Sequence, residues 1–395
     1  MKNPINHKIA YSLSSGIIVK LLVDTTSQIF NPFLTIIASG MGISVVFLGG
    51  LVGLRSLLGL SAPLFGSIAD RIGYRKVMQV CLFLTGSGML LIGLSESMFL
   101  FITGIILTGF GQGGFVPNIQ AYISSKMPYH RRALGIGMLE YSWALASMIG
   151  LLAAGFLIEE FTWRTPFIFI GILIFISWLF LFTLPVSEKK SWVKNTSSLS
   201  SRISNFIHLG SNAKSAWGTI IIQGFTLFSI MHLLIIHGGW LIDEYALSPS
   251  ALGKAALIMG FTDLSASISV SLFVDKLGKK RSVAIGLTGL MMGFILLPFF
   301  NQGIIVAIIG LIIPRTFFEF ALVSNIALVS EQVPEQRGKV LSLSAASGLL
   351  GTTAAVILGP ISYYNIGISG LSVISLISAI IAFMVLIFLV KEKSI

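Results

Sequence analysis

Long apolar segments recur from one end of this chain to the other, and their length limits the folds that it can adopt. A helix needs about 20 predominantly apolar residues to cross the hydrocarbon core of a bilayer. Twelve segments are of this order, near residues 9–38, 43–68, 76–95, 98–125, 133–158, 164–186, 215–240, 250–274, 281–300, 302–330, 339–361 and 367–390. The sequence therefore predicts an all-α membrane protein with twelve transmembrane helices.

The amino-acid composition supports a membrane protein and argues against a soluble domain, a nucleic-acid-binding protein and a disulfide-rich fold. Charged residues make up 10% of the 395 positions, against about 25% in a typical soluble domain. The net charge of +11 does not indicate nucleic-acid binding, because membrane proteins concentrate Lys and Arg on one face. Cys81 stands alone, so no disulfide framework is expected. The first span contains Lys20 and Asp24 and exceeds a signal-peptide core of about 7–15 residues, so we interpret it as a retained helix.

Basic residues gather in alternate connecting segments. The segments before, between and after successive pairs of spans hold 21 of the 26 Lys and Arg residues. The opposite loops carry acids instead, namely Glu96, Glu159, Glu160, Asp243 and Glu244. By the positive-inside rule, both termini and the segment 187–214 are predicted to be cytoplasmic. That segment is polar and Ser-rich and falls in the middle of the chain, as an interdomain linker would.

Two short motifs occur twice. "DRIGYRK", residues 70–76, recurs as "DKLGKKR", residues 275–281, and "PYHRRA" from Pro128 recurs as "PEQRGK" from Pro334, with offsets of 205 and 206 residues. The chain is therefore predicted to comprise two pseudo-symmetric six-helix bundles, 1–186 and 215–395, joined by the linker 187–214. Parallel repeats of this kind are a known transporter plan, with the substrate site where the repeats meet.

The first of these motifs lies within "GSIADRIGYRKV", which resembles the signature of the major facilitator superfamily between its second and third helices. "FTWRTPFIFIG", around Trp163 and Arg164, resembles the family's entry to helix six. The resemblance spans essentially the whole chain and implies a transporter fold whose first, fourth, seventh and tenth helices line a cavity. The general pattern is most similar to the drug:proton antiporter-like branch. However, "IILTGFG" lacks the fourth-helix Arg that many proton-coupled members carry, and "SMIGLLAAG" lacks the Gly-Pro that drug antiporters often show. Tyr74 stands where the family often has a basic residue.

The charged loop of the signature is predicted to act as a conformational latch. Asp70 ends a helix at the cytoplasmic face, where its carboxylate can bridge to Arg side chains or to a positive helix N-terminus. Such contacts would exist in only one arrangement of the two halves, whereas the alternative is a solvated loop anchor. Gly73 permits the tight turn. The predicted latch comprises Gly66, Asp70, Arg71, Gly73, Arg75, Lys76, Arg131, Asp275, Lys276, Gly278 and Arg337.

Ionisable residues inside the spans are the candidates for binding substrate or protons, because a charge at mid-membrane costs a few kcal/mol or more. These candidates are Asp24, Arg55, Glu140, Asp263, Arg315, Glu319 and His232. The repeat offset aligns Asp24, Arg55 and Arg315 with uncharged positions. This asymmetry favours a role in binding or coupling over a role in shared packing. Asp24 is the leading candidate for a protonatable or substrate-binding carboxylate.

Each candidate also has a structural alternative. Lys20 with Asp24, and Arg315 with Glu319, are spaced four apart, so each pair could neutralise itself on one helix face. Arg55 could be a structural partner of Asp24. The alternatives for the others are that Glu140 pairs with Arg131 or Arg132, and that His232 is a packed, hydrogen-bonded histidine.

The sequence thus predicts a secondary active transporter, not an enzyme, that moves a small solute by alternating access. Proton-coupled efflux of amphipathic compounds is the leading interpretation. The alternatives are proton-linked uptake of a metabolite or siderophore, and a non-transporting sensor on the same fold. We expect no cofactor, metal or nucleic acid; the expected partners are a small-molecule substrate, protons and the lipid bilayer. The protein is expected to be a monomer in a bacterial inner membrane.

Overall fold

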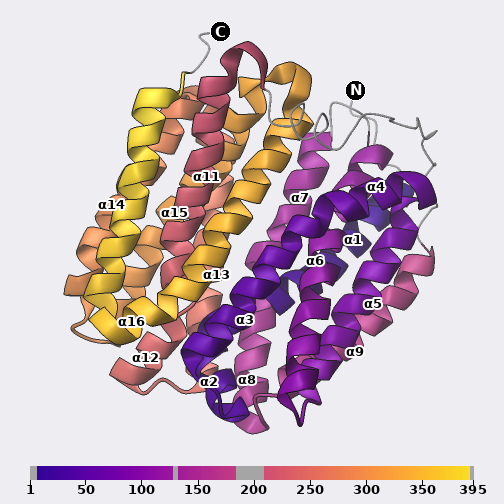
Figure 1. Cartoon of the computed structure of the whole chain (residues 1–395), viewed down its shortest axis with the longest axis vertical. Helices are drawn as coiled ribbons and strands as arrows, with labels where there is room; N and C mark the ends of the chain where they lie inside the picture. The colour runs from indigo at the N-terminus through magenta and orange to yellow at the C-terminus, as the bar shows by residue number, and fades with distance from the viewer. Residues whose placement is uncertain (1–6, 128–131, 184–208, 392–395) are drawn as a thin grey trace. The chain divides into compact units, whose positions relative to one another are not determined.

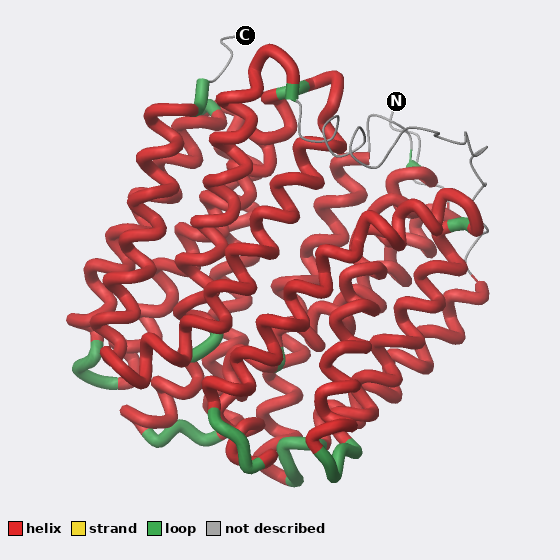
Figure 2. Tube along the Cα trace, in the orientation of Figure 1, coloured by secondary structure: helices red, strands yellow, loops and turns green. Residues whose placement is uncertain are grey.

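The computed structural model describes residues 7–127, 132–183 and 209–391, and every regular element within these ranges is a helix (Figure 2). The prediction of an all-α protein is confirmed. The predicted linker 187–214 lies largely outside the described residues, as do the two chain ends. The two-bundle division and the cytoplasmic termini therefore stay predictions.

The helices before the linker follow the order of the predicted spans (Figure 1). They are α1 (His7–Gln28), α2 (Phe30–Met41), α3 (Val45–Leu58), α4 (Ala62–Ile72), α5 (Tyr74–Gly93), α6 (Met98–Lys126), α7 (Arg132–Leu145), α8 (Leu152–Glu160) and α9 (Thr165–Phe180). A π-helix, Ala146–Leu151, joins α7 to α8. Pro32 cannot donate a hydrogen bond to the carbonyl of Gln28, which explains the break between α1 and α2.

The helices after the linker are α11 (Ala213–Leu234), α12 (His237–Tyr245), α13 (Pro249–Leu277), α14 (Lys279–Leu296), α15 (Ile304–Gln332) and α16 (Arg337–Leu389). In the described ranges, ten helices are long and apolar enough to cross a membrane. The longest, α16, contains the non-helical Gly367 and so supplies two of the predicted spans. Because α1 and α2 together cover the first predicted span, each of the twelve has a helical counterpart.

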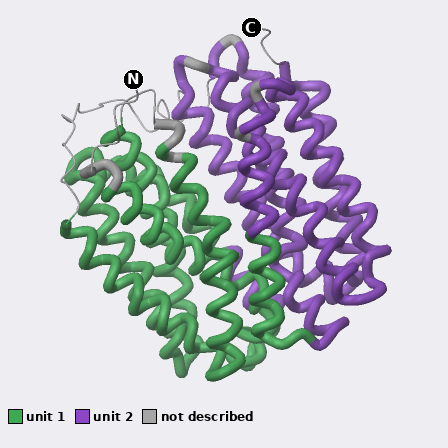
Figure 3. Tube along the Cα trace, turned by 180° about the vertical axis from the view of Figure 1, so that it is seen from behind, with its two compact units in different colours: residues 1–44, 54–193, 247–260 green, residues 45–53, 194–246, 261–395 purple. Residues whose placement is uncertain are grey.

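The described helices pack into two compact units (Figure 3). The first contains residues 1–44, 54–193 and 247–260, and the second contains residues 45–53, 194–246 and 261–395. In the first unit, α5 packs against α6 and α9, and α1 packs against α7. In the second, α11 packs against α16 and α15, and α14 packs against α15.

Large apolar side chains cover much of the outer surface of these helices. Phe99, Ile305 and Phe388 are 76%, 73% and 69% exposed, respectively. Exposed apolar area on this scale would be unusual for a soluble monomer. These side chains are placed as expected for helices that contact lipid.

The two copies of the repeated motif share one backbone conformation. Gly73 has φ 95° and ψ 143°, and Gly278, 205 residues later, has φ 87° and ψ 141°. Each glycine donates its N–H to the carbonyl four residues earlier, Ala69 and Val274 respectively. A positive φ is costly for residues with a Cβ, so both copies need glycine at this position. The sequence repeat therefore corresponds to a repeated helix–turn–helix geometry.

Glycines of α6 allow close packing against α5. A Cβ added to Gly111 would lie 2.6 Å from the carbonyl oxygen of Cys81, and one added to Gly114 would lie 2.5 Å from the Cys81 Sγ. Small residues permit this backbone approach between helices in membranes. The glycine-rich stretch of the fourth span is thus a packing surface in the first unit.

Gly111→Val is expected to destabilise the protein by about 1–3 kcal/mol, because overpacking forces helix backbones apart. The readout is the apparent melting temperature of the purified protein in detergent. Gly137→Val is the matched control, since nothing lies within 4 Å of a Cβ added to Gly137. Equal melting temperatures for both variants would contradict the packing argument.

Candidate functional site

A buried ion pair lies in the C-terminal half of α1. Lys20 Nζ is 2.9 Å from Asp24 Oδ2, and these residues are 1% and 2% exposed, respectively. The predicted neutralisation across one helical turn is therefore present. The pair does not stand alone, however, because the same ammonium also contacts a second carboxylate from α7.

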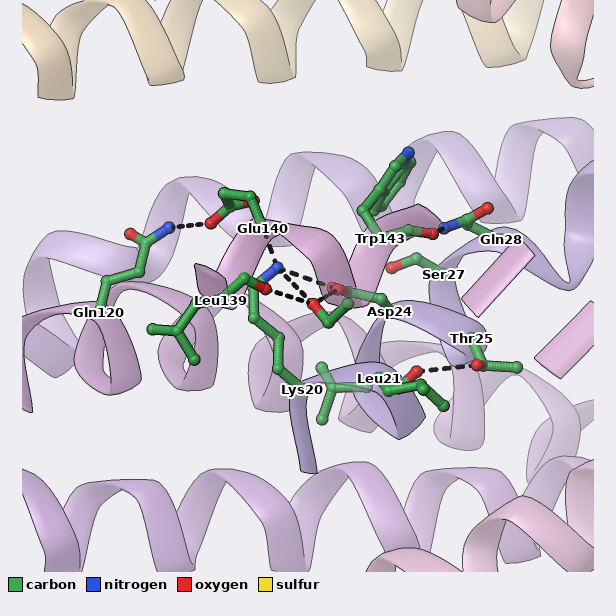
Figure 4. A network of polar contacts seen from close by, with 12 residues as sticks. Lys20, Leu21, Asp24, Thr25, Ser27, Gln28, Gln120, Leu139, Glu140 and Trp143 are labelled. Carbon is green, nitrogen blue, oxygen red and sulfur yellow. Dashed lines mark hydrogen bonds and ion pairs between the residues drawn. The ribbon is translucent and has the colours of Figure 1, made fainter. Parts of the chain in front are cut away.

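That second carboxylate is Glu140, whose Oε2 lies 3.3 Å from Lys20 Nζ (Figure 4). The Glu140 side chain is 49% exposed, and its other oxygen accepts a hydrogen bond of 2.8 Å from Gln120 Nε2. Of the two alternative partners foreseen for Glu140, Arg131 lies outside the described residues, as does the side chain of Arg132. The structure instead joins Glu140 to Lys20, 120 residues earlier in the chain.

Ser142 completes this cluster. Its hydroxyl lies 2.5 Å from Asp24 Oδ2 and 2.7 Å from the carbonyl of Leu139, and it accepts a bond of 3.1 Å from Lys20. One hydroxyl proton can serve only one of these two acceptors at a time. Lys20, Asp24, Glu140 and Ser142 thus form a connected path from a buried carboxylate to an exposed one, called the α1–α7 cluster below.

A π-helix lies next to this cluster. Gln28 Nε2 donates to the carbonyl of Trp143 at 2.9 Å, and Ser147 Oγ donates to Gln28 Oε1 at 2.8 Å. A Cβ on Gly150 would overlap the side chain of Thr25. Single π turns inside α-helices are frequent at functional sites. The sequence "ASMIGL" carries no signal that distinguishes this turn from ordinary helix, so sequence reasoning did not find it.

Arg55 of α3 is buried among neutral acceptors. Its Nε donates to Thr108 Oγ1 at 3.1 Å, and its Nη2 donates to Gln112 Oε1 at 2.7 Å. Nη2 also lies 3.3 Å from Thr26 Oγ1 and 3.4 Å from Ser27 Oγ. Within the described ranges Arg55 forms no ion pair. The structure does not place Asp24 among the hydrogen-bond partners of Arg55; Asp24 instead contacts Lys20 and Ser142 through its Oδ2.

The second unit contains a different buried ion pair. Arg315 of α15 donates from Nε to both oxygens of Asp263 on α13, at 2.8 and 3.0 Å, and from Nη2 at 2.6 Å. Arg315 is 6% exposed and Asp263 is 4% exposed. Glu319, one turn from Arg315, accepts a bond of 2.8 Å from Ser267. The structure thus gives Arg315 a bidentate carboxylate partner on another helix, 52 residues away in the chain.

His232 is enclosed by hydroxyl groups. Its Nδ1 lies 3.1 Å from Ser375 Oγ, its Nε2 lies 2.9 Å from Ser362 Oγ, and its ring stacks on Phe228. The structure thus agrees with the packed, hydrogen-bonded alternative. The helix ends at Leu234, two residues after His232, and restarts as α12.

The structure places most of the predicted latch residues at or near helix ends, with Gly66 inside α4. Gly66, Asp70 and Arg71 lie on α4, Arg75 and Lys76 start α5, and Lys276 and Arg337 are exposed on α13 and α16. Arg131 and the side chain of Asp275 lie outside the described residues. Tyr74 Oη donates to Asp70 Oδ1 at 3.2 Å, so the residue that departs from the family pattern holds the signature carboxylate. The latch itself stays a prediction.

Comparisons with known proteins agree with this architecture. The chain matches the Major Facilitator Superfamily over residues 16–318 and 221–394. It is 23% identical over 391 residues to YwfA, an uncharacterized MFS-type transporter of Bacillus subtilis (strain 168), covering 96% of this chain and 89% of that protein. A shorter match, 31% identical over 159 residues, relates it to the multidrug resistance protein MdtG of Klebsiella pneumoniae (strain 342), covering 38% and 36% of the two chains.

A solved structure shares the fold. The crystal structure of a D-xylose-proton symporter superposes with a TM-score of 0.78 at 18% sequence identity, covering 97% of this chain and 98% of that one. The family match extends from the first span to the last. This chain is therefore an integral membrane protein that belongs to the Major Facilitator Superfamily of transporters.

Proposed function

We propose that this protein is a proton-coupled secondary transporter that exports amphipathic small molecules by alternating access. The observation that carries the proposal is the α1–α7 cluster, in which one ammonium, Lys20, contacts the two carboxylates Asp24 and Glu140. The similarity to MdtG, whose name denotes multidrug resistance, supports export but covers 38% of this chain.

The charge balance of the cluster suits proton binding. With all three groups ionised it carries one more negative than positive charge, and uptake of one proton neutralises it. A buried net charge is costly in low dielectric, so protonation and the exposure of Asp24 are thermodynamically linked. Glu140 is half exposed while Asp24 is buried, so a proton can pass between solvent and the interior through Ser142 and Lys20.

The proposed transport cycle couples this protonation to the two halves of the chain. In one state Asp24 is protonated and neutral, and in the other it is ionised and paired with the Lys20 ammonium. The predicted latch around Asp70 would stabilise one arrangement of the halves, with both termini in the cytoplasm of a bacterial cell. A ligand shifts such an equilibrium only by its differential affinity for the two states.

Proteoliposomes with an internal pH-sensitive dye test the proposal. A panel of fluorescent amphipathic compounds is added under an imposed pH gradient, and proton movement and compound accumulation are recorded together. Proton flux opposite in direction to the movement of the compound supports export by antiport, and proton flux in the same direction as the compound supports uptake by symport. Saturable binding with no flux would contradict the proposal and favour a sensor.

Glu140→Gln is expected to lower the initial rate of solute-driven proton flux by at least about tenfold, because the exposed proton-exchanging group is lost. Accumulation at equilibrium should change less, since Asp24 still binds the proton. Glu160→Gln is the matched control, an exposed acid at the end of α8. An unchanged rate in Glu140→Gln would remove Glu140 from the proton path.

A further inference from the structure

Arg55 is a buried positive charge that forms no ion pair with a carboxylate among the residues that the structure describes. Arg55 is 5% exposed, and its hydrogen-bond partners among the described residues, Thr26, Ser27, Thr108 and Gln112, are all uncharged. An isolated charge of this kind is strongly disfavoured in an apolar interior unless an opposite charge approaches it. The ring of Phe30 lies 5.6 Å from the guanidinium carbon, and its face attracts a cation without carrying a negative charge.

The neutral partners are oriented as acceptors. Thr26 Oγ1 donates its own proton to the carbonyl of Val23, and Thr108 Oγ1 donates to the carbonyl of Ile105. Gln112 Nε2 donates to Ser27 Oγ, so that its carbonyl oxygen faces Arg55. The groups around Arg55 therefore fix the position of its guanidinium while leaving its charge uncompensated.

One nitrogen of the guanidinium remains free for a ligand. Nε and Nη2 make all the hydrogen bonds that Arg55 forms with the described residues, and Nη1 makes none of them. Arginine commonly binds carboxylate and phosphate oxygens through such N–H groups. A buried guanidinium that is fixed in position by neutral acceptors and has one nitrogen without a hydrogen bond to them can bind an anion.

We propose that Arg55 binds the anionic group of the transported solute, so that the substrates are small organic anions with an apolar body. This inference rests on the proposed transport function and names its substrate class. The α1 segment links the two sites, because Asp24 belongs to the α1–α7 cluster while Thr26 and Ser27 contact Arg55. An anion that binds Arg55 and a proton that binds Asp24 therefore both change the contacts of one turn of α1.

Binding of radiolabelled benzoate to the purified protein in phosphatidylcholine nanodiscs tests the proposal. Saturable binding is expected in the natural protein, competed by unlabelled benzoate and not by benzamide, its uncharged counterpart. Arg55→Gln should weaken binding at least about tenfold, the loss of one hydrogen bond to a charged group. Arg55→Lys should retain part of the affinity. Arg164→Gln is the matched control, an arginine of the same unit that donates to the carbonyl of Ser95.

Several outcomes would overturn the assignment. These are the absence of saturable benzoate binding, binding that Arg55→Gln leaves unchanged, and equal competition by sodium chloride or by phosphatidylglycerol added to the nanodiscs, which would assign the site to an inorganic ion or a lipid headgroup. The test separates this proposal from the transport function. Proton flux with cationic or neutral compounds, without benzoate binding, refutes the anion site alone. Arg55-dependent benzoate binding without any flux refutes the transport proposal alone.

Discussion

Asp24→Asn is expected to abolish solute accumulation driven by a pH gradient while leaving solute exchange across proteoliposomes intact. Asparagine has nearly the shape of aspartate but cannot take up or release a proton. The binding pocket and the movement of the halves should survive, because Lys20 retains Glu140 as an ionic partner at 3.3 Å. Gradient-driven accumulation should therefore fall to the level of empty liposomes, and counterflow should proceed.

The matched control is Asp243→Asn, which changes an acid outside the α1–α7 cluster that accepts a hydrogen bond from Tyr363. This variant should accumulate solute normally. A double variant, Lys20→Gln with Asp24→Asn, tests folding, since it removes both charges of the buried pair together. Normal accumulation by a well-expressed Asp24→Asn protein would exclude Asp24 as the coupling site.

Arg315→Gln is expected to produce the largest loss of stability among single substitutions of buried charges. It leaves Asp263 buried and removes the cation to which that carboxylate is paired. Breaking a buried pair by removing one partner costs about 3–5 kcal/mol. The measurement is the apparent melting temperature of the purified protein, together with the fraction that elutes as a monodisperse peak.

The double variant Arg315→Gln with Asp263→Asn serves as the internal control. It removes both charges of the pair while keeping groups that can hydrogen-bond, so it should recover much of the lost stability. Coupling energies between contacting residues reveal such a pair directly. If the two single changes and the double change were simply additive, the Arg315–Asp263 contact would not be the source of the stability.

The helical architecture could be predicted because hydropathy, charge and the backbone freedom of glycine are properties of each residue type, whatever its tertiary contacts. Hydropathy predicts the positions of the spans, and the Lys and Arg residues identify one set of connecting loops. Gly73 and Gly278 occupy equivalent positions of the repeated motif and predict the same turn in both copies. The structure agrees with the span order and with the near-identical backbone angles of both glycines. The identity of the buried charged residues was also predictable, because a charged residue within a long apolar segment can be recognised from the sequence without knowing its contacts.

The partners of those charges were not predictable. Spacing of four residues suggested Lys20 with Asp24 and Arg315 with Glu319, and the first of these two ion pairs is present. It could not show that Glu140 pairs with Lys20, that Asp263 accepts bonds from two nitrogens of Arg315, or that Arg55 pairs with no acid in the described ranges. The π-helix beside Gln28 could not be predicted from the sequence either.

The physical reason is the range of each interaction. Burial in lipid and helix formation depend on a residue and its neighbours within a few turns, so the linear order contains them. An ion pair needs two atoms within about 4 Å, and whether residues 52 or 120 positions apart reach that distance depends on how the helices pack side by side and rotate about their axes. Membrane insertion could thus be inferred from the chain itself, whereas the assignment of each buried charge to a partner, or to none, required the packed helices.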